Sequence, residues 1–287
     1  MIRTTVLAAT LAVVFPTAQA AQPLQLKVYN ADGNSFNVNS SLVYGEKEAM
    51  VIDAGFTRAD ALRIAANVLD SGKQLKIIFV SQADPDYYFG VETLKEIFPQ
   101  AEVLATAAVL DKLSAKVAGK MAFWAPKMGA NAPKVPLLPK VMTGNTLTID
   151  GEKIEVHGQQ GILAHRPYLW IPSLKAIVGN IGVFGNLHVW TADTQSLTER
   201  AAWLAQLDEM AALNPSVVVP GHMQSGTKID ISAIQYTKRY LQTFEKNAGT
   251  SKNSAELIAS MKKAYPDAPP GLALDIGAKV NKGEMKW

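Results

Sequence analysis

Two carboxylates, Asp84 and Asp86, lie two residues apart in a short segment that also carries aromatic residues and reaches Gly90. The segment directly follows an apolar run over residues 75–80, which is typical of a strand buried on both faces. α/β proteins place ligands on loops just beyond such strands, where oxygen donors can converge on one hard cation. The alternative is turn chemistry, in which Asp side chains accept hydrogen bonds from nearby backbone amides.

A histidine follows a second apolar run, the three valines at residues 217–219. Pro220 and Gly221 separate this run from His222, and a glycine lets the backbone approach a neighbouring group closely. Most single histidines are structural. His222 is a stronger candidate because the chain has only four histidines and this one ends a core strand.

Two kinds of chemistry are open to these residues. Asp84, Asp86 and His222 could hold one divalent metal ion that keeps an open position for water. Without a metal, Asp84 or Asp86 could act as a general base, because each carboxylate raises the pKa of the other. The chain contains no cysteine, which excludes thiolate ligands and disulfides.

Strands and helices alternate around these residues. Thr57 is a typical helix N-cap with Asp60 three residues further on, and Gly72 closes the predicted helix. Strands are predicted at 24–29, 41–44, 49–53, 75–80, 103–105, 146–149, 153–157, 168–171, 176–178 and 217–219, and helices at 57–71, 91–98, 197–213, 231–246 and 254–265. A β-rich opening followed by α/β units occurs twice, which predicts an α/β four-layer sandwich with helices outside two face-to-face sheets.

Residues 119–143 interrupt this alternation. They contain several prolines, together with Trp124 and Met128, and show no clear periodicity. A long irregular segment inside a domain is usually a surface flap or a binding loop. An ordinary winding connection explains the same sequence equally well.

Residues 1–20 have the order of features expected of a secretory signal peptide. Arg3 precedes an apolar run over residues 6–15, and Ala18 and Ala20 are the small residues that a signal peptidase reads. The apolar run is too short to span a bilayer. We therefore expect a periplasmic or secreted protein, with a buried N-terminal helix as the alternative.

The composition limits the class of protein and its partners. A hydrophobic content of 48% with 18% charged residues is that of a globular chain with a sizeable core. The net charge of +3 comes without a block of like charges, so we expect no nucleic acid partner. No later apolar run reaches about 18 residues, so we expect no membrane association after the signal is removed. We expect one domain over residues 21–250, with a C-terminal helix and tail over 251–287 packed on it.

The order of the elements, the ligand-like loop and the Pro-Gly-His turn resemble the metallo-β-lactamase superfamily over about residues 24–247. The resemblance implies a four-layer αββα fold with a two-zinc hydrolytic site. In that family the loop reads His-x-His-x-Asp-His and is followed closely by glycine. These positions fall here on Gln82, Asp84, Asp86 and Tyr87, and the glycine matches Gly90.

The remaining ligand positions of the family are also altered in this chain. The next family histidine falls on Ile162, and His165 lies three residues further on as a substitute. The bridging aspartate falls on Asn180, whereas the last histidine is kept as His222. Asp53 matches a family residue that supports the site. The resemblance therefore implies a largely dismantled zinc site in which Asp86 and His222 are the ligands that remain.

Two functions are consistent with this pattern. The first is an exported hydrolase of an ester, lactone or amide, in which Asp84, Asp86 and His222, with His165 as a further candidate, hold one zinc, manganese or iron ion. Asn180 or Tyr87 would then stabilise the developing oxyanion. The second is a periplasmic binding protein for a small molecule, with neither metal nor catalysis. The polar character of the replacements favours the enzyme, and convergence of the metal-binding side chains on one point would support it.

Overall fold

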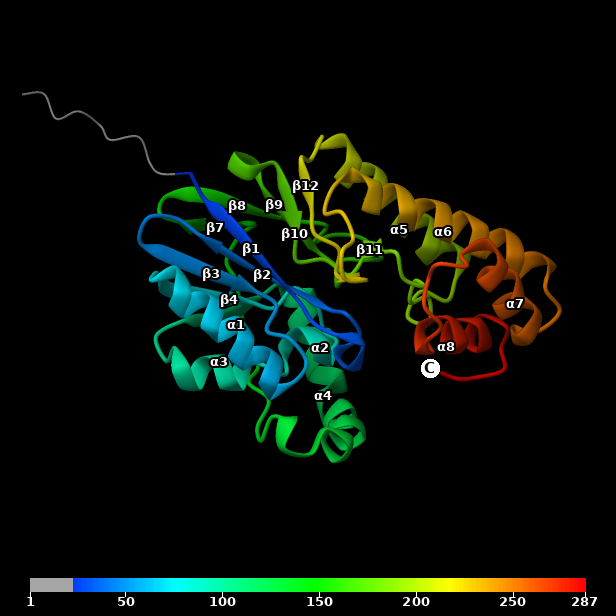
Figure 1. Ribbon diagram of the computed structural model, residues 1–287, viewed down its shortest axis with the longest axis horizontal. Coiled ribbons are helices and arrows are strands. Elements are labelled where there is room, and N and C mark those ends of the chain that lie inside the picture. The colour runs from blue at the N-terminus through cyan, green and yellow to red at the C-terminus, as the bar shows by residue number, and fades with distance from the viewer. Residues whose placement is uncertain (1–22) are drawn as a thin grey trace, which may run out of the picture.

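The computed structural model describes residues 23–287, and the predicted signal peptide lies in residues 1–22, outside the described part. Within the described part, two sheets pack face to face and helices cover their outer faces (Figure 1). The sequence-based prediction of an α/β four-layer sandwich is confirmed.

The first sheet is mixed and contains six strands in the order β1-β2-β3-β4-β5-β6. The strands are β1 (Gln25–Asn30), β2 (Asn39–Tyr44), β3 (Glu48–Ile52), β4 (Gln74–Phe79), β5 (Glu102–Ala105) and β6 (Lys140–Val141). β1, β2 and β3 are antiparallel, whereas β3 to β6 are parallel. The carboxyl ends of the parallel strands therefore meet at one edge, where the loop after β4 emerges.

The second sheet has the strand order β12-β10-β9-β8-β7. Its strands are β7 (Thr146–Ile149), β8 (Glu152–His157), β9 (Tyr168–Ile171), β10 (Ala176–Val178) and β12 (Val217–Val218). β10 and β12 are parallel, so the loops that follow them leave the sheet on the same side. A short parallel ribbon of β11 (Phe184–Gly185) and β13 (His222–Met223) continues these loops.

Helices cover both sheets, with α1 and α3 on the first sheet and α5 and α6 on the second (Figure 1). Their bounds are α1 (Arg58–Ser71), α2 (Pro85–Tyr88), α3 (Val91–Ile97), α4 (Ala107–Met128), α5 (Leu197–Ala212), α6 (Ile231–Thr250), α7 (Ser254–Ala264) and α8 (Leu272–Asn281). Thr57 and Asp60 form a capping box at the start of α1, and Gly72 ends the helix with a left-handed φ of 66°. The predicted start and end of this helix are confirmed.

Alternate residues of the inner strands contribute to different hydrophobic cores. On β3, Ala49 and Val51 face the helices of the first sheet, whereas Met50 and Ile52 face the core between the two sheets. A third core lies between the second sheet and helices α5 to α8. A small fourth cluster stands apart from these three beside the strand ends and consists of Ala31, Val38, Tyr87 and Ile181.

Helix α4 corrects the prediction that residues 119–143 are irregular. The helix runs to Met128 and contains Gly119 and Pro126, the residues that obscure its pattern in the sequence. Apolar side chains at helical spacing pack against the first core, and they are Val109, Leu113, Val117, Met121, Trp124 and Met128. This packing outweighs the low helix propensity of glycine and proline, because tertiary contacts override intrinsic preference. Only the part after α4 is largely irregular.

The C-terminal segment forms two helices rather than the single predicted one. Helix α7 agrees with the expected range, and α8 was not predicted. Leu274 and Ala278 of α8 pack in the third core, with Leu257 and Met261 of α7. In residues 23–287 no helix is both long and apolar enough to span a bilayer.

Candidate functional site

The sequence-predicted site residues come from three chain segments at neighbouring strand ends. Asp86 and Tyr87 lie in the short helix α2 after β4, Asn180 follows β10, and His222 follows β12. Gly221 allows the close contact among these segments. A Cβ atom at this glycine would lie 2.1 Å from the carbonyl oxygen of Asn180 and 2.6 Å from the Tyr87 hydroxyl. No larger residue can occupy this position without displacing its neighbours.

The imidazole of His222 is held on both sides. Its Nδ1 lies 3.0 Å from the carbonyl oxygen of Phe36, which can only accept, so this nitrogen carries the proton. Its Nε2 therefore presents a lone pair and lies 3.1 Å from the hydroxyl of Tyr87. The ring stacks on Phe184 with 5.3 Å between ring centroids. Burial lowers the pKa of His222 to about 4, so the imidazole is neutral at pH 7.

Asp86 completes a buried cluster with these two residues. Its Oδ2 lies 3.6 Å from Nε2 of His222. Burial, assisted by the negative charge of Asp84, raises the pKa of Asp86 to about 8. A protonated carboxyl, a neutral imidazole and a tyrosine hydroxyl therefore stand together at neutral pH. Such a group can hold or pass a proton, and it carries no net charge.

Asp53 supports the loop after β4, as the resemblance implied. Its two carboxylate oxygens accept hydrogen bonds from the backbone N–H and the hydroxyl of Ser81, both at 2.8 Å. Burial raises the pKa of Asp53 to about 7 in spite of these hydrogen bonds. The aspartate thus fixes the first residue of the loop against the end of β3.

Other positions that correspond to family ligands are engaged in internal hydrogen bonds or exposed. The Gln82 amide donates to the carbonyl oxygen of Pro167 at 3.1 Å. The Asn180 amide donates to the carbonyl oxygen of Val219, and its oxygen accepts from the N–H of Val183, both at 2.9 Å. Ile162 is 51% exposed. The polarity of Gln82 and Asn180 is thus explained by structural hydrogen bonds rather than by metal binding.

The arrangement does not support the expectation that Asp84, Asp86, His222 and His165 hold one metal ion. The Asp84 carboxylate faces Lys120 at 3.5 Å, and His165 lines a neighbouring pocket. Throughout residues 23–287, no three His, Cys, Asp or Glu side chains are arranged so that they could hold a metal ion. Asp86 and His222 alone supply fewer donors than the three that a hydrolytic zinc site uses. The donor set therefore does not fit a divalent metal.

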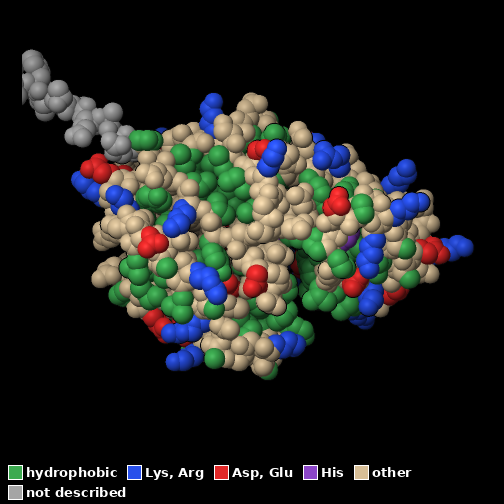
Figure 2. Space-filling view, viewed as in Figure 1, with side chains coloured by type: hydrophobic (Ala, Val, Ile, Leu, Met, Phe, Trp, Pro, Cys, Tyr) green, Lys and Arg blue, Asp and Glu red, His purple; other side chains and the backbone are tan. Residues whose placement is uncertain are grey.

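A cationic pocket adjoins the cluster, and sequence reasoning missed most of it. Lys112 and Lys116 come from α4, Arg166 from the loop before β9, and Asp193 from the loop before α5. The full lining is Gln82, Ala83, Asp84, Lys112, Lys116, His165, Arg166, Ile181, Trp190 and Asp193. A signal was present in the i, i+4 spacing of the lysines, but it has meaning only once α4 is known to be a helix. Figure 2 shows the molecule hollowed between the half that carries α1 and α4 and the half that carries α7 and α8.

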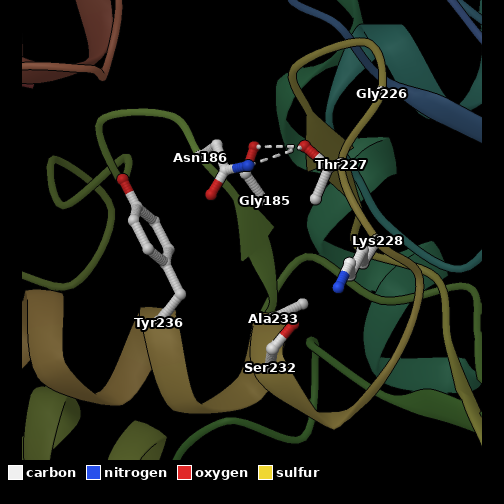
Figure 3. A pocket seen from close by; sticks show the side chains of 8 residues that line it. All are labelled: Gly185, Asn186, Gly226, Thr227, Lys228, Ser232, Ala233 and Tyr236. Atoms are coloured by element: carbon white, nitrogen blue, oxygen red, sulfur yellow. Dashed lines mark hydrogen bonds between the residues drawn. The ribbon is translucent and has the colours of Figure 1, made fainter.

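A larger hollow lies between β11 and the start of α6 (Figure 3). Three of its polar side chains, Asn186, Thr227 and Tyr236, are bonded to one another or to the backbone. The Asn186 amide donates to the Thr227 hydroxyl at 3.3 Å, and the Tyr236 hydroxyl donates to the carbonyl oxygen of Leu187 at 2.8 Å. None of the sequence-predicted site residues lines this hollow, so the candidate site is the cationic pocket with the neighbouring cluster.

Comparison with known proteins agrees with this fold. Residues 33–155 match the model of the metallo-beta-lactamase superfamily. No curated protein sequence is significantly similar to this chain. DIM-1 metallo-beta-lactamase, from a crystal exposed to ceftazidime, is 18% identical with a TM-score of 0.54, and the match covers 78% of this chain and 95% of that one.

Two further solved structures give the same picture. A metallo-beta-lactamase from Pontibacter korlensis is 18% identical with a TM-score of 0.52, and the match covers 78% of this chain and 97% of that one. VMB-1 at pH 5.5 is 16% identical with a TM-score of 0.55, covering 78% and 94%. These structures show the shared fold. Together with the family match over residues 33–155, they show that this chain has the metallo-β-lactamase fold.

Proposed function

We propose that this chain is an exported, small-molecule-binding protein that keeps the metallo-β-lactamase fold and works without a catalytic metal. The proposal rests on one observation: most side chains at the former ligand positions are engaged with other groups of the protein. Gln82 and Asn180 bond to the backbone, and Asp84 faces a lysine. Asp86 and His222 are left as a pair, without the third donor that a hydrolytic metal site needs.

The cationic pocket supports a binding role. It lies directly beside the former metal-binding segments and is lined by both charged and apolar side chains. The pocket is narrow, with a cavity volume of about 20 Å³, so only a very small ligand fits it without movement of its side chains. Because folds outlast particular activities, loss of the metal does not require loss of ligand binding. The periplasmic location rests on the signal-like sequence of residues 1–20.

One observation favours hydrolysis of an ester, lactone or amide as a second candidate function. The superfamily typically binds divalent metals. The Nε2 lone pair of His222 and the Asp86 carboxyl, 3.6 Å apart, are the remnant of one such site. A zinc, manganese or iron ion would need the Tyr87 hydroxyl to move and a further donor to reach the pair.

The metal content of the purified protein separates the two functions. It is measured by elemental mass spectrometry after incubation with zinc, manganese and iron, beside an Asp86→Ala, His222→Ala double variant. The binding-protein proposal expects the same background metal content in both. Near-stoichiometric metal in the wild type that is lost in the double variant would overturn the proposal in favour of the hydrolase.

A further inference from the structure

The last residues of the sequence lie beside the cationic pocket. Trp287 packs edge-on against Trp190, with 5.1 Å between ring centroids and 69° between ring planes. Its indole N–H donates to Oδ1 of Asp193 at 3.1 Å. Nζ of Lys120 lies 5.6 Å from the centre of the Trp287 ring, within the range of a cation–π contact. One side chain thus contacts both α4, which packs on the first sheet, and the loop before α5.

The residues that Trp287 contacts belong to the pocket or hold its lining in place. Trp190 and Asp193 line the pocket, and Asp193 also accepts the indole N–H of Trp190 at 2.6 Å. Lys120 lies 3.5 Å from Asp84, which is a further lining residue. Trp287 is not itself part of the lining and is 46% exposed. It therefore packs against the pocket wall from outside.

The pocket is closed in this arrangement. Its cavity volume of about 20 Å³ has room for about one water molecule. Arg166 in the lining is only 6% exposed, with Cζ 4.2 Å from the centre of the Trp203 ring. Its Nη1 has no hydrogen-bond partner within residues 23–287, and a buried N–H without a partner costs free energy. A small molecule can therefore reach Arg166 only if the wall of the pocket moves.

The segment that carries Trp287 is fixed at its base and weakly held at its tip. At the base, Nζ of Lys282 donates to the carbonyl oxygen of Ser251 at 2.7 Å, and the Glu284 carboxylate accepts the backbone N–H of Ser254 at 2.7 Å. At the tip, Trp287 has one hydrogen bond and two aromatic contacts in a half-exposed place. Such contacts are individually weak, so the tip can detach while α8 stays folded.

We propose that residues 285–287 form an autoinhibitory strap, with Trp287 as its tip, that keeps the cationic pocket closed until the tip detaches. Detachment frees Oδ1 of Asp193 on the loop before α5. The ion pair of Asp193 with Lys116 of α4, at 3.6 Å, then restrains the loop only weakly because water screens it. The loop moves away from α4, and Arg166 becomes accessible. This inference rests on the proposed function, since it describes how access to the same site is controlled.

The rate at which phenylglyoxal modifies Arg166 tests the proposal, because this small reagent reacts with the guanidinium groups that it can reach. Peptide mass spectrometry follows the reaction, with the exposed Arg58 as the reference for reagent activity. Trp287→Ala should raise the Arg166 rate about fivefold or more, because loss of the tip contacts raises the population of the open form. Trp287→Phe keeps a ring but loses the N–H, so its rate should lie between. Lys286→Ala, at an exposed position of the same segment, should match the wild type.

Arg200 shows whether the C-terminal helices themselves have loosened. It is 6% exposed and donates to the Asn281 side chain of α8. An Arg200 rate that rises together with the Arg166 rate in Trp287→Ala would mean that α8 has come loose, and would overturn the strap. An unchanged Arg166 rate in folded Trp287→Ala would overturn it as well.

These rates are independent of the metal measurement that tests the proposed function. Failure of the strap leaves the binding-protein proposal standing. Near-stoichiometric metal in the wild type would overturn that proposal without changing the expected Arg166 rates.

Discussion

The hydroxyl of Tyr87 lies 3.1 Å from Nε2 of His222, in the direction where this nitrogen would otherwise meet a metal ion. Phe36 fixes the other ring nitrogen, so the imidazole cannot turn away without losing a hydrogen bond. The tyrosine thus satisfies the nitrogen that the resemblance assigns to a metal ion. Replacing Tyr87 with a metal-binding residue should therefore make the His222 nitrogen available to a metal ion again.

Tyr87→His should restore measurable zinc binding. The new imidazole would stand beside Asp86 and His222 and would supply the third donor that a zinc site needs. Zinc should then raise the Tm of the variant, and elemental mass spectrometry should find bound zinc. Tyr87→Phe removes the hydroxyl without adding a donor and serves as the matched control. Equal zinc content in both variants would refute the prediction.

Asp86→Asn should change how stability depends on pH. The pKa of Asp86 is raised to about 8 in the folded protein from an ordinary value of 3.8, so the folded state holds a proton that the unfolded state releases between these values. Wild-type stability should therefore fall relative to the variant as pH rises from about 4 to 8, by at most about 1.4 kcal/mol per pH unit. Denaturant titrations at several pH values measure this difference. Asp267→Asn, at an exposed position, should run parallel to the wild type.

Gly221→Ala should destabilise the protein by roughly 2–3 kcal/mol, because the added methyl group collides with the Asn180 carbonyl oxygen. Gly119→Ala should do the opposite. Its methyl group meets open space on helix α4, and the helix gains about 0.5–1 kcal/mol from the better helix former. Urea unfolding of the two variants measures both changes in the free energy of unfolding. A stable Gly221→Ala protein would show that the loops after β10 and β12 can move apart.

Leu113→Ala should lower the free energy of unfolding by roughly 2–5 kcal/mol, since this residue of α4 is fully buried in the first core. Phe123→Ala, at a side chain that is 55% exposed on the same helix, should cost far less. Circular dichroism during thermal unfolding distinguishes the two. A similar loss of stability in both variants would mean that the exposed face of α4 contributes as much to stability as the buried face.

The sequence predicted those elements whose local signals agree with their packing. The Thr57 cap and the Gly72 stop predict α1 correctly, and the continuous apolar runs at 75–80 and 217–219 predict the strands that lead to the site. Helix α4 is absent from the prediction, because Gly119 and Pro126 hide the apolar spacing that continues through them. Helix α8 was missed because the stretch after α7 was read as a tail.

The candidate site could be predicted only in part. Asp86, Tyr87 and His222 come together as the resemblance implied, because the family's strand order brings their loops to one edge. Arg166 could not be chosen, since a single arginine in a loop carries no signal of burial or of a missing partner. Nor could the direction of Asp84 be known, because Lys120 approaches it from a helix distant in sequence.

The small fourth cluster, which holds Tyr87 and Ile181, is separate from the three large cores. The polar residues beside this cluster are themselves buried, and the ring of His222 stacks on Phe184 of the third core. Substitutions that change the small cluster alone therefore leave the three large cores in place, whereas changes at Gly221 or His222 also disturb packing outside it. The side chains of this cluster can therefore vary without first rebuilding the three cores that fold the chain.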